Sequence, residues 1–235
     1  MVYLKNKYHE VVSDEYTAGI AFLCRVINFL EDVLEDAECD DIYVNSVALN
    51  ARTVVLHAVR CKYDVFESIE VFQDRYRVNV KEGIGDLPLR ELYEHVIDYY
   101  KKTLHRRMKQ YAWKTHISGV EYYLGVLFNG KGFLIEGEKN KVILPGTPQC
   151  FSAHTHPLDP PVPSKNDVKA VNRILVDRGI GHVIEAVRSS LAIYRVRPLS
   201  LRDYETLKSL EKKGSFVEMI ARTADGAAIR ARYIH

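Results

Sequence analysis

His154-Thr155-His156-Pro157, followed by Pro163-Ser164-Lys165-Asn166-Asp167, is the stretch that decides which fold and chemistry we expect of this chain. In an extended strand, side chains two residues apart point to the same face, so both imidazoles can reach one metal ion. Asp167 can add an anionic ligand from the start of the following helix. Two nitrogen ligands and one oxygen ligand suit Zn²⁺ with a fourth position left for water, which is typical of catalytic rather than structural sites.

Each half of this pattern also has an ordinary interpretation. A lone H-x-H is common in surface strands and needs no metal. Ser164-x-x-Asp167 alone is typical of a helix N-cap with an acidic residue in the first turn. The two halves in this order and at this spacing are much more specific than either alone, and together they favour a metal site.

Residues 154–167 resemble the JAMM (MPN+) metallopeptidases, whose signature is an upstream Glu followed by H-x-H-x(7)-S-x-x-D. The resemblance implies one Zn²⁺ per chain, with His154, His156 and Asp167 as its ligands. It implies that the Ser164 hydroxyl donates to the oxyanion that develops during hydrolysis. It also implies a JAMM/MPN-like (cytidine-deaminase-like) α/β sandwich in the C-terminal half of the chain.

The upstream carboxylate in this resemblance is Glu121, in the segment 119–130, which is similar to the Glu-led strand of the family. The family places a glycine three residues after the Glu, whereas Gly125 stands four residues after Glu121, so we expect a β-bulge to absorb the extra residue. The stretch from Glu121 to the two histidines is short for the family and lacks its usual helix. Glu136 and Glu138 are the alternative carboxylates, and their ordinary interpretation is a solvated hairpin.

The resemblance also implies a reaction and a partner. Glu121 would activate the zinc-bound water and return its proton to the leaving amine. The implied substrate is an isopeptide bond between a lysine and a ubiquitin-like protein, so the partner would be a ubiquitin-like protein or its conjugates. Two rival interpretations are a non-catalytic MPN scaffold and a RadC-like nucleic-acid-associated protein. Gly83-Ile84-Gly85, before a basic helix, is faintly similar to the helix–hairpin–helix that precedes the RadC domain.

Composition narrows the class of protein. The chain has 235 residues, of which 47% are hydrophobic and 27% charged, as expected of a globular protein. The formal net charge of +2 argues against a dedicated nucleic-acid binder. We see neither a signal-peptide h-region nor a membrane-spanning run, so we expect a cytoplasmic protein without a membrane partner. The cysteines form no C-x-x-C pair and are expected to be free thiols: Cys24, Cys39, Cys61 and Cys150.

Residues 1–85 have the pattern of a small α+β module. Ser13-Asp14 offers an N-cap, and apolar residues then recur every three or four positions, which predicts a helix over residues 14–36. We expect this module to recognise a substrate or partner and to take no part in the chemistry. Alternating and β-branched patterns predict strands over residues 53–61, 66–72 and 76–80.

Residues 86–235 are expected to form the metallopeptidase-like domain with its leading helix. Pro88 suits a helix start, and an apolar stripe predicts that this helix continues to Trp113. Farther along, we expect strands leading into the H-x-H, a helix over 164–177, a strand over 182–196 and a helix capped by Ser200. Exposure to solvent explains the basic character of the other face of this helix more simply than contact with nucleic acid does. That face carries Lys101, Lys102, His105, Arg106, Arg107 and Lys109.

Overall fold

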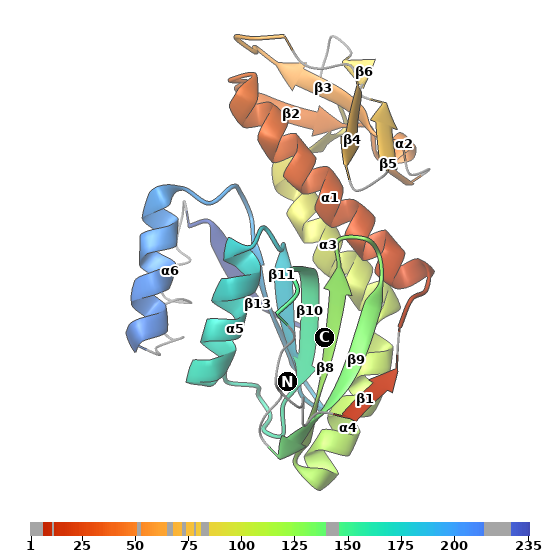
Figure 1. The fold of residues 1–235 in the computed structure, drawn as a ribbon, viewed down its shortest axis with the longest axis vertical. Helices are drawn as coiled ribbons and strands as arrows, with labels where there is room; N and C mark the ends of the chain where they lie inside the picture. The colour runs from red at the N-terminus through yellow and green to blue at the C-terminus, as the bar shows by residue number, and fades with distance from the viewer. Residues whose placement is uncertain are drawn as a thin grey trace.

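A computed structural model shows a mixed α/β chain (Figure 1). Its described residues form a seven-stranded sheet, a four-stranded sheet and a two-stranded ribbon. The α/β class predicted from the sequence is confirmed. None of the helices in the described part of the chain is both long and apolar enough to cross a membrane. The described residues are 7–10, 12–50, 53–64, 68–71, 74–77, 79–80, 85–139, 146–213 and 227–235.

The larger sheet has seven strands in the order β1-β9-β8-β10-β11-β12-β13. β10 (Gln149–Thr155) and β11 (Gly181–Glu185) are parallel neighbours at its centre, and the other adjacent pairs are antiparallel. Every residue of these two strands is buried, as expected where a sheet is covered on both faces. The remaining strands are β1 (Lys7–Glu10), β8 (Val120–Leu127), β9 (Gly132–Lys139), β12 (Ser190–Arg195) and β13 (Ile229–Ile234).

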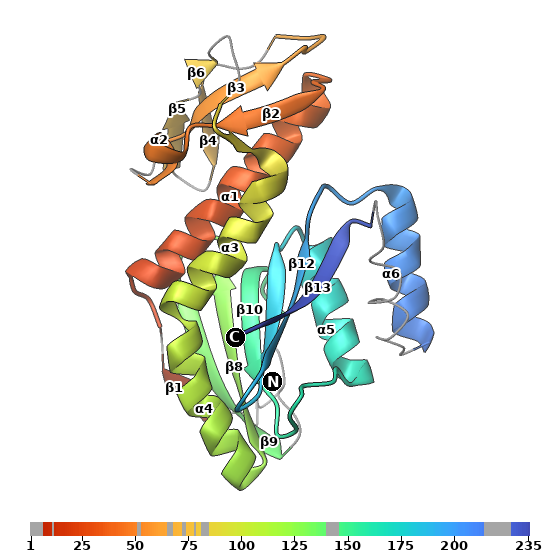
Figure 2. The same cartoon turned by 180° about the vertical axis from the view of Figure 1, so that it is seen from behind.

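Helices cover both faces of this sheet (Figures 1 and 2). The first layer comprises α1 (Glu15–Asp36), α3 (Leu89–Thr103) and α4 (His105–Ser118), and the second comprises α5 (Lys165–Val176) and α6 (Leu201–Lys213). Neighbouring strand residues alternate between the two layers. Val183 of β11 belongs to the core beneath α1 and α3, whereas the next residue, Ile184, packs with α5 and α6.

A smaller sheet lies beyond the C-terminal end of α1 (Figure 1). Its strand order is β6-β3-β2-β7, and a separate two-stranded ribbon pairs β4 with β5. Cys39 and Cys61 form a disulfide here, so the expectation of four free thiols is wrong for this pair, while Cys24 and Cys150 are free and buried. The elements are β2 (Asp41–Val44), α2 (Ser46–Asn50), β3 (Val55–Val59), β4 (Ser68–Val71), β5 (Asp74–Arg77), β6 (Asn79–Val80) and β7 (Leu87–Pro88).

The boundary predicted between residues 85 and 86 does not follow the packing. β1 pairs with β9 at the edge of the large sheet, and α1 packs against β8 and β10. Ile27 of α1 and Phe151 of β10 are both fully buried in one continuous hydrophobic core. β1 and α1 therefore pack with residues 86–235, because α1 covers part of one face of the sheet together with α3 and α4.

A buried ion pair fastens α1 to the sheet. Arg195 of β12 lies 3.0 Å from Glu31 and donates a 2.9 Å hydrogen bond to the side chain of Asn28. The Tyr93 hydroxyl donates to Glu31 at 2.6 Å, which adds α3 to the same cluster. A buried charge is tolerated only when it is paired and hydrogen-bonded, and these contacts meet that condition.

The bounds of α1 confirm the helix predicted over residues 14–36. Two other predicted elements need correction. The single helix expected up to Trp113 is two helices that meet at buried Leu104. Just before the break, the Thr103 hydroxyl bonds the carbonyl of Tyr99 at 2.6 Å, a contact that bends helices.

The single strand expected over 182–196 is instead the hairpin of β11 and β12. Its turn is closed by the Ala186 N–H, which donates to the carbonyl of Ser189 at 3.0 Å. The turn contains no glycine or proline, so the usual sequence signal for a turn is missing. The predicted strands over 66–72 and 76–80 correspond to β4, β5 and β6 within the described residues, whereas Gly83 and Ile84 lie outside them.

Candidate metal centre

His154 and His156 lie at the end of β10, on the side of the sheet covered by α5. His154 pairs in register with Ile184, which packs under that helix. His156 follows the strand, and its N–H donates to the carbonyl of Glu185 at 2.7 Å. The centroids of the two imidazole rings are 6.2 Å apart, with 70° between the ring planes. The strand therefore brings the two histidines together, although the second lies just beyond its last residue.

Ser164 and Asp167 form the N-cap of α5 through a reciprocal capping box. The Ser164 Oγ accepts from the Asp167 N–H at 3.2 Å, and the Ser164 N–H donates to Asp167 Oδ2 at 2.6 Å. The other carboxylate oxygen of Asp167, Oδ1, lies 3.3 Å from His154 Nε2. The cap and the metal-ligand interpretations are thus compatible, because the cap uses one oxygen and turns the other toward the histidine.

The electrostatics of these groups depend on one another. Burial lowers the pKa of His154, but the nearby Asp167 and Glu121 carboxylates raise it, and the net shift is upward. Burial and the neighbouring His154 lower the pKa of His156. Burial raises the pKa of Asp167, but the contacts with His154 and Ser164 outweigh it and hold the pKa well below its usual range. Asp167 is therefore an anion at neutral pH, which suits a metal ligand.

Glu121 lies on β8, beside β10 and on the same side of the sheet as His154. Tyr123, two residues farther along β8, pairs in register with His154, and side chains two apart share a face. Glu121 is only 8% exposed. Burial raises the pKa of Glu121, as does the charge of Asp167, while His154 acts in the opposite direction. The structure thus places the predicted acid/base beside the predicted ligands.

The alternative carboxylates differ from Glu121 in position. Glu136 of β9 pairs in register with Tyr122, which faces the core under α1 and α3 and not the histidines. The side chain of Glu138 lies outside the described residues. The β-bulge expected between Glu121 and Gly125 is wrong, because residues 122–125 of β8 pair with β9 in unbroken register. A register shift lies instead between Val120 and Tyr122, and its extra residue is in β9.

Gly125 has a packing reason of its own. A Cβ at this position would lie 2.6 Å from Gln149 Oε1 and would overlap the ring of Phe133. The glycine therefore lets these two side chains cover β8 directly beside the histidines.

The donor set fits zinc in its chemistry. His154 Nε2 and His156 Nδ1 are buried without a hydrogen-bond partner, whereas buried polar atoms almost always have one. Two imidazoles and a carboxylate are common zinc ligands. Over the described ranges, however, no group of three or more His, Cys, Asp or Glu side chains is arranged to hold a metal ion. The residues thus have the right atoms, and metal binding would have to draw the three donors closer.

His182 is the principal neighbour that the sequence analysis did not select. Its Nε2 lies 2.7 Å from His154 Nδ1, and its Nδ1 lies 2.6 Å from Ser152 Oγ. Burial, together with the neighbouring His154, keeps the pKa of His182 well below its usual value, so this imidazole is neutral. The sequence offers one signal, a histidine within an apolar stretch, but its place beside His154 depends on the parallel pairing of β11 with β10.

Glu185 is a second residue that sequence reasoning missed. Its carboxylate accepts from Tyr100 at 2.7 Å, lies 2.8 Å from His105 Nδ1 and 3.4 Å from Lys109 Nζ, and also bonds Ser190. His105 and Lys109 had been assigned to a solvated basic face, but they are turned toward this buried carboxylate. Since the Glu185 carbonyl holds the backbone of His156, the cluster supports the second histidine from the α4 side.

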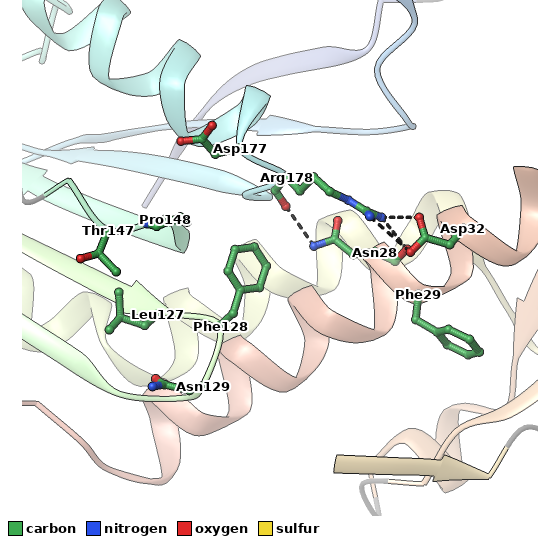
Figure 3. Close-up of a pocket in the computed structure, with 10 residues that line it drawn as sticks. All are labelled: Asn28, Phe29, Asp32, Leu127, Phe128, Asn129, Thr147, Pro148, Asp177 and Arg178. Atoms are coloured by element: carbon green, nitrogen blue, oxygen red, sulfur yellow. Dashed lines mark hydrogen bonds and ion pairs between the residues drawn. The ribbon is translucent and has the colours of Figure 1, made fainter. Parts of the chain in front are cut away.

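A cavity of about 490 Å³ lies at the opposite end of β10, between α1 and the β8–β9 turn (Figure 3). Leu127, Phe128 and Pro148 give it a largely apolar lining. Arg178 also lines the cavity, and its guanidinium is already hydrogen-bonded: it donates to Asp32 at 2.7 Å and to the carbonyl of Asn28 at 2.8 Å. This cavity contributes no group to the candidate metal centre.

Comparison of the chain with protein-family models, with curated proteins and with solved structures finds no match in any of the three.

Proposed function

We propose that this chain is a zinc-dependent isopeptidase or peptidase with a JAMM/MPN-like fold and mechanism. One observation carries the proposal: His154 Nε2 and His156 Nδ1 are buried without hydrogen-bond partners, and the Asp167 carboxylate lies 3.3 Å from the former. A buried nitrogen without a hydrogen bond destabilises a fold unless something binds it. A cation that accepts lone pairs is the simplest group to satisfy both histidines and the anion together.

His154, His156 and Asp167 would hold the ion. Zinc, when bound, polarises a carbonyl oxygen and activates water for attack. The second oxygen of Asp167 is fixed by the Ser164 N–H, so the ligand does not have to be ordered on binding. Support from second-layer hydrogen bonds of this kind is common around metal ligands.

Glu121 is the group that would move the proton. Because burial raises its pKa toward neutrality, the carboxylate can accept a proton from the attacking water and return it to the leaving amine. Ser164 would stabilise the oxyanion. Its Oγ acts as acceptor in the helix cap, so the O–H remains able to donate to the carbonyl oxygen that gains charge.

The proposed substrate is an isopeptide between a lysine and the C-terminus of a ubiquitin-like protein. The loop between the histidines and α5 offers apolar side chains to such a protein, since Leu158 is 67% and Val162 is 59% exposed. Asp159 anchors this loop by accepting from the Ser189 hydroxyl. A cytoplasmic location belongs to the same proposal, and the Cys39–Cys61 disulfide is the observation against it.

The test combines metal analysis with hydrolysis by the full-length chain. We expect about one zinc per chain, bound tightly as in other three-ligand sites. Glu121→Gln should retain zinc and lose ~10²–10⁴-fold in kcat on a lysine-linked isopeptide, because an amide cannot carry the proton. Glu136→Gln, which alters a carboxylate on the other side of the sheet, is the matched control. Absence of zinc after addition, or full activity of Glu121→Gln, would refute the proposal.

A further inference from the structure

The turn between β11 and β12 is held by one ammonium group from α4. Lys109 Nζ donates to the carbonyl of Ala186 at 2.6 Å and to the carbonyl of Ser189 at 3.0 Å, and it lies 3.4 Å from Glu185 Oε2. An ammonium has three N–H groups and no lone pair, so the lysine is the donor in each contact. Because residues 186–189 include no glycine or proline, this cation holds the turn in place of the usual turn-forming residues.

The same turn binds the segment 156–159 at both of its ends. At the first end, the His156 N–H donates to the carbonyl of Glu185 at 2.7 Å. At the other end, Asp159 accepts twice: Oδ2 from the Arg188 N–H and Oδ1 from the Ser189 hydroxyl, each at 2.5 Å. The loop that follows the second histidine is therefore fixed to the turn, and the turn is fixed to α4.

The charges favour the same arrangement. Burial raises the pKa of Asp159, but the bonds from Ser189 and Arg188 and the nearby charge of Lys109 outweigh it, and the net shift is downward. The Asp159 carboxylate is therefore ionised at neutral pH and can accept with both oxygens. Lys109 thus acts on the loop in two ways, through the turn and through its charge, although it belongs to α4.

Leu158 lies inside the segment that is fixed at both ends. Its side chain is 67% exposed, so it is available to another molecule. A partner that covers a side chain on a mobile loop must first order that loop, and this ordering weakens binding. Leu158 avoids most of that loss, because His156 and Asp159 already hold the backbone on either side of it. The result is an apolar contact at a constant position beside the candidate metal centre.

We propose that Lys109 and Asp159 brace this loop through the turn 185–189, and that they thereby hold Leu158 in place as a specificity-determining contact for a folded protein substrate. Lys109 and Asp159 are positioning residues, since they act through the turn and the loop backbone. The role of Leu158 in substrate binding rests on the proposed function. The brace, meaning the contacts of Lys109 and Asp159 with residues 185–189, requires neither metal nor substrate and is tested separately.

The first measurement is amide hydrogen exchange in the zinc-free full chain, followed by NMR. Lys109→Met should speed exchange of the His156 and Arg188 amides by ~10-fold, because the turn that places their acceptors is released. Asp159→Ala should speed the Arg188 amide alone. Lys109→Arg keeps a cation and its donors, so it should recover part of the protection. The matched control is Lys101→Met, which removes an exposed ammonium from α3 and should change neither amide.

Two results would overturn the brace: unchanged exchange of both amides in Lys109→Met, or an Arg188 amide as protected in Asp159→Ala as in the wild type. Lys109→Met also leaves the buried Glu185 carboxylate with one cation fewer, which destabilises the fold. If that variant does not fold, Lys109→Met combined with Glu185→Gln removes the charge as well. The same exchange measurement on the double variant then decides.

The second measurement compares KM and kcat on two probes, lysine-linked di-ubiquitin and a short Gly-Gly–lysine isopeptide. Asp159→Ala should raise KM for di-ubiquitin by ~10-fold with kcat unchanged, because the contact it disturbs is made equally in the ground and transition states. Leu158→Ser should have the same effect. Asp159→Asn should recover part of the loss, since its Oδ1 can accept from the Arg188 N–H. Cleavage of the short isopeptide should change little in all three variants.

Equal KM for di-ubiquitin in wild type, Asp159→Ala and Leu158→Ser would overturn the role of the brace in specificity. A wild-type chain that cleaves only the short isopeptide would overturn the role of Leu158. If the exchange rates show the brace but the zinc-loaded chain cleaves neither probe, the brace stands, and the proposed function fails together with the role of Leu158.

Discussion

Two Ser-x-x-Asp helix caps, at α5 and α6, share the same two hydrogen bonds between a backbone N–H and a side chain, and at α6 the Ser200 hydroxyl also donates to Asp203 Oδ2 at 2.5 Å. In each, the Ser Oγ accepts from the Asp N–H, at 3.2 Å for Ser164 and 3.3 Å for Ser200. In each, Asp Oδ2 accepts from the Ser N–H, at 2.6 Å and 2.8 Å respectively. The side chains of Asp167 and Asp203 are similarly shielded, at 17% and 19% exposure. The two caps differ in the side chain, from elsewhere in the fold, that contacts the aspartate.

Asp203 meets the guanidinium of Arg197 through two hydrogen bonds, at 2.7 Å and 3.0 Å, whereas Asp167 faces the imidazole of His154. A guanidinium is a permanent cation with no lone pair to offer, so the α6 cap is complete. An imidazole nitrogen without a hydrogen-bond partner, beside a carboxylate, can still bind a metal. The helix cap therefore depends on residues that are neighbours in sequence. Whether a metal can bind depends on the side chain that the rest of the fold places against the aspartate, which is His154 at α5 and Arg197 at α6.

The largest difference between the caps should appear in metal binding. Asp167→Asn is expected to weaken zinc by more than ~100-fold, because losing an anionic ligand should exceed the loss of an outer-layer partner. Asp203→Asn is the matched control and should bind zinc as the wild type does. Competition titrations of the two variants decide the matter. Equal affinity in Asp167→Asn and wild type would leave Asp167 as a helix cap only.

The second difference concerns folding stability without metal. Asp203→Asn breaks a charge-assisted pair with Arg197, and hydrogen bonds to charged groups contribute about 1.5–3 kcal/mol each. Because the pair is only partly buried, we expect a loss near the lower end of that range. Asp167→Asn should cost less, because its partner His154 is charged only when protonated, whereas the Arg197 guanidinium is always charged. Urea unfolding of both zinc-free variants measures this, and a larger loss in Asp167→Asn would reverse the comparison.

The parts of the structure that could be predicted from the sequence are divided in the same way, into features set by neighbouring residues and features set by distant ones. Features that depend on neighbouring residues were predicted, including α1 with its Asp14 cap and the cap of α5 at Ser164. The approach of Asp167 to His154 was expected from the resemblance, and the structure brings them within 3.3 Å. What could not be predicted depends on strand pairing across the chain: α1 beneath the sheet, and His182 beside His154 through the parallel pair β10–β11.

The caps should also differ in how zinc binding responds to pH. A protonated imidazole cannot bind metal, so affinity falls as pH falls through the pKa of each histidine. Asp167 and Glu121 raise the pKa of His154, so proton competition should begin above the ordinary value of about 6.5. Asp167→Asn should move this onset to lower pH, and Asp203→Asn should not. Chelator competition over a pH series checks both, and an unshifted onset in Asp167→Asn would contradict the assigned cause.

The smallest effects on zinc affinity should come from the two serines. Ser164→Ala and Ser200→Ala each remove a side-chain cap, which costs about 1 kcal/mol of stability. Zinc affinity should change little even in Ser164→Ala, because the backbone N–H that holds Asp167 Oδ2 is retained in the alanine variant. Thermal unfolding and zinc titration of the pair test this. If Ser164→Ala lost as much zinc affinity as Asp167→Asn, the Ser164 hydroxyl, and not its backbone N–H, would be the group that orients the Asp167 carboxylate.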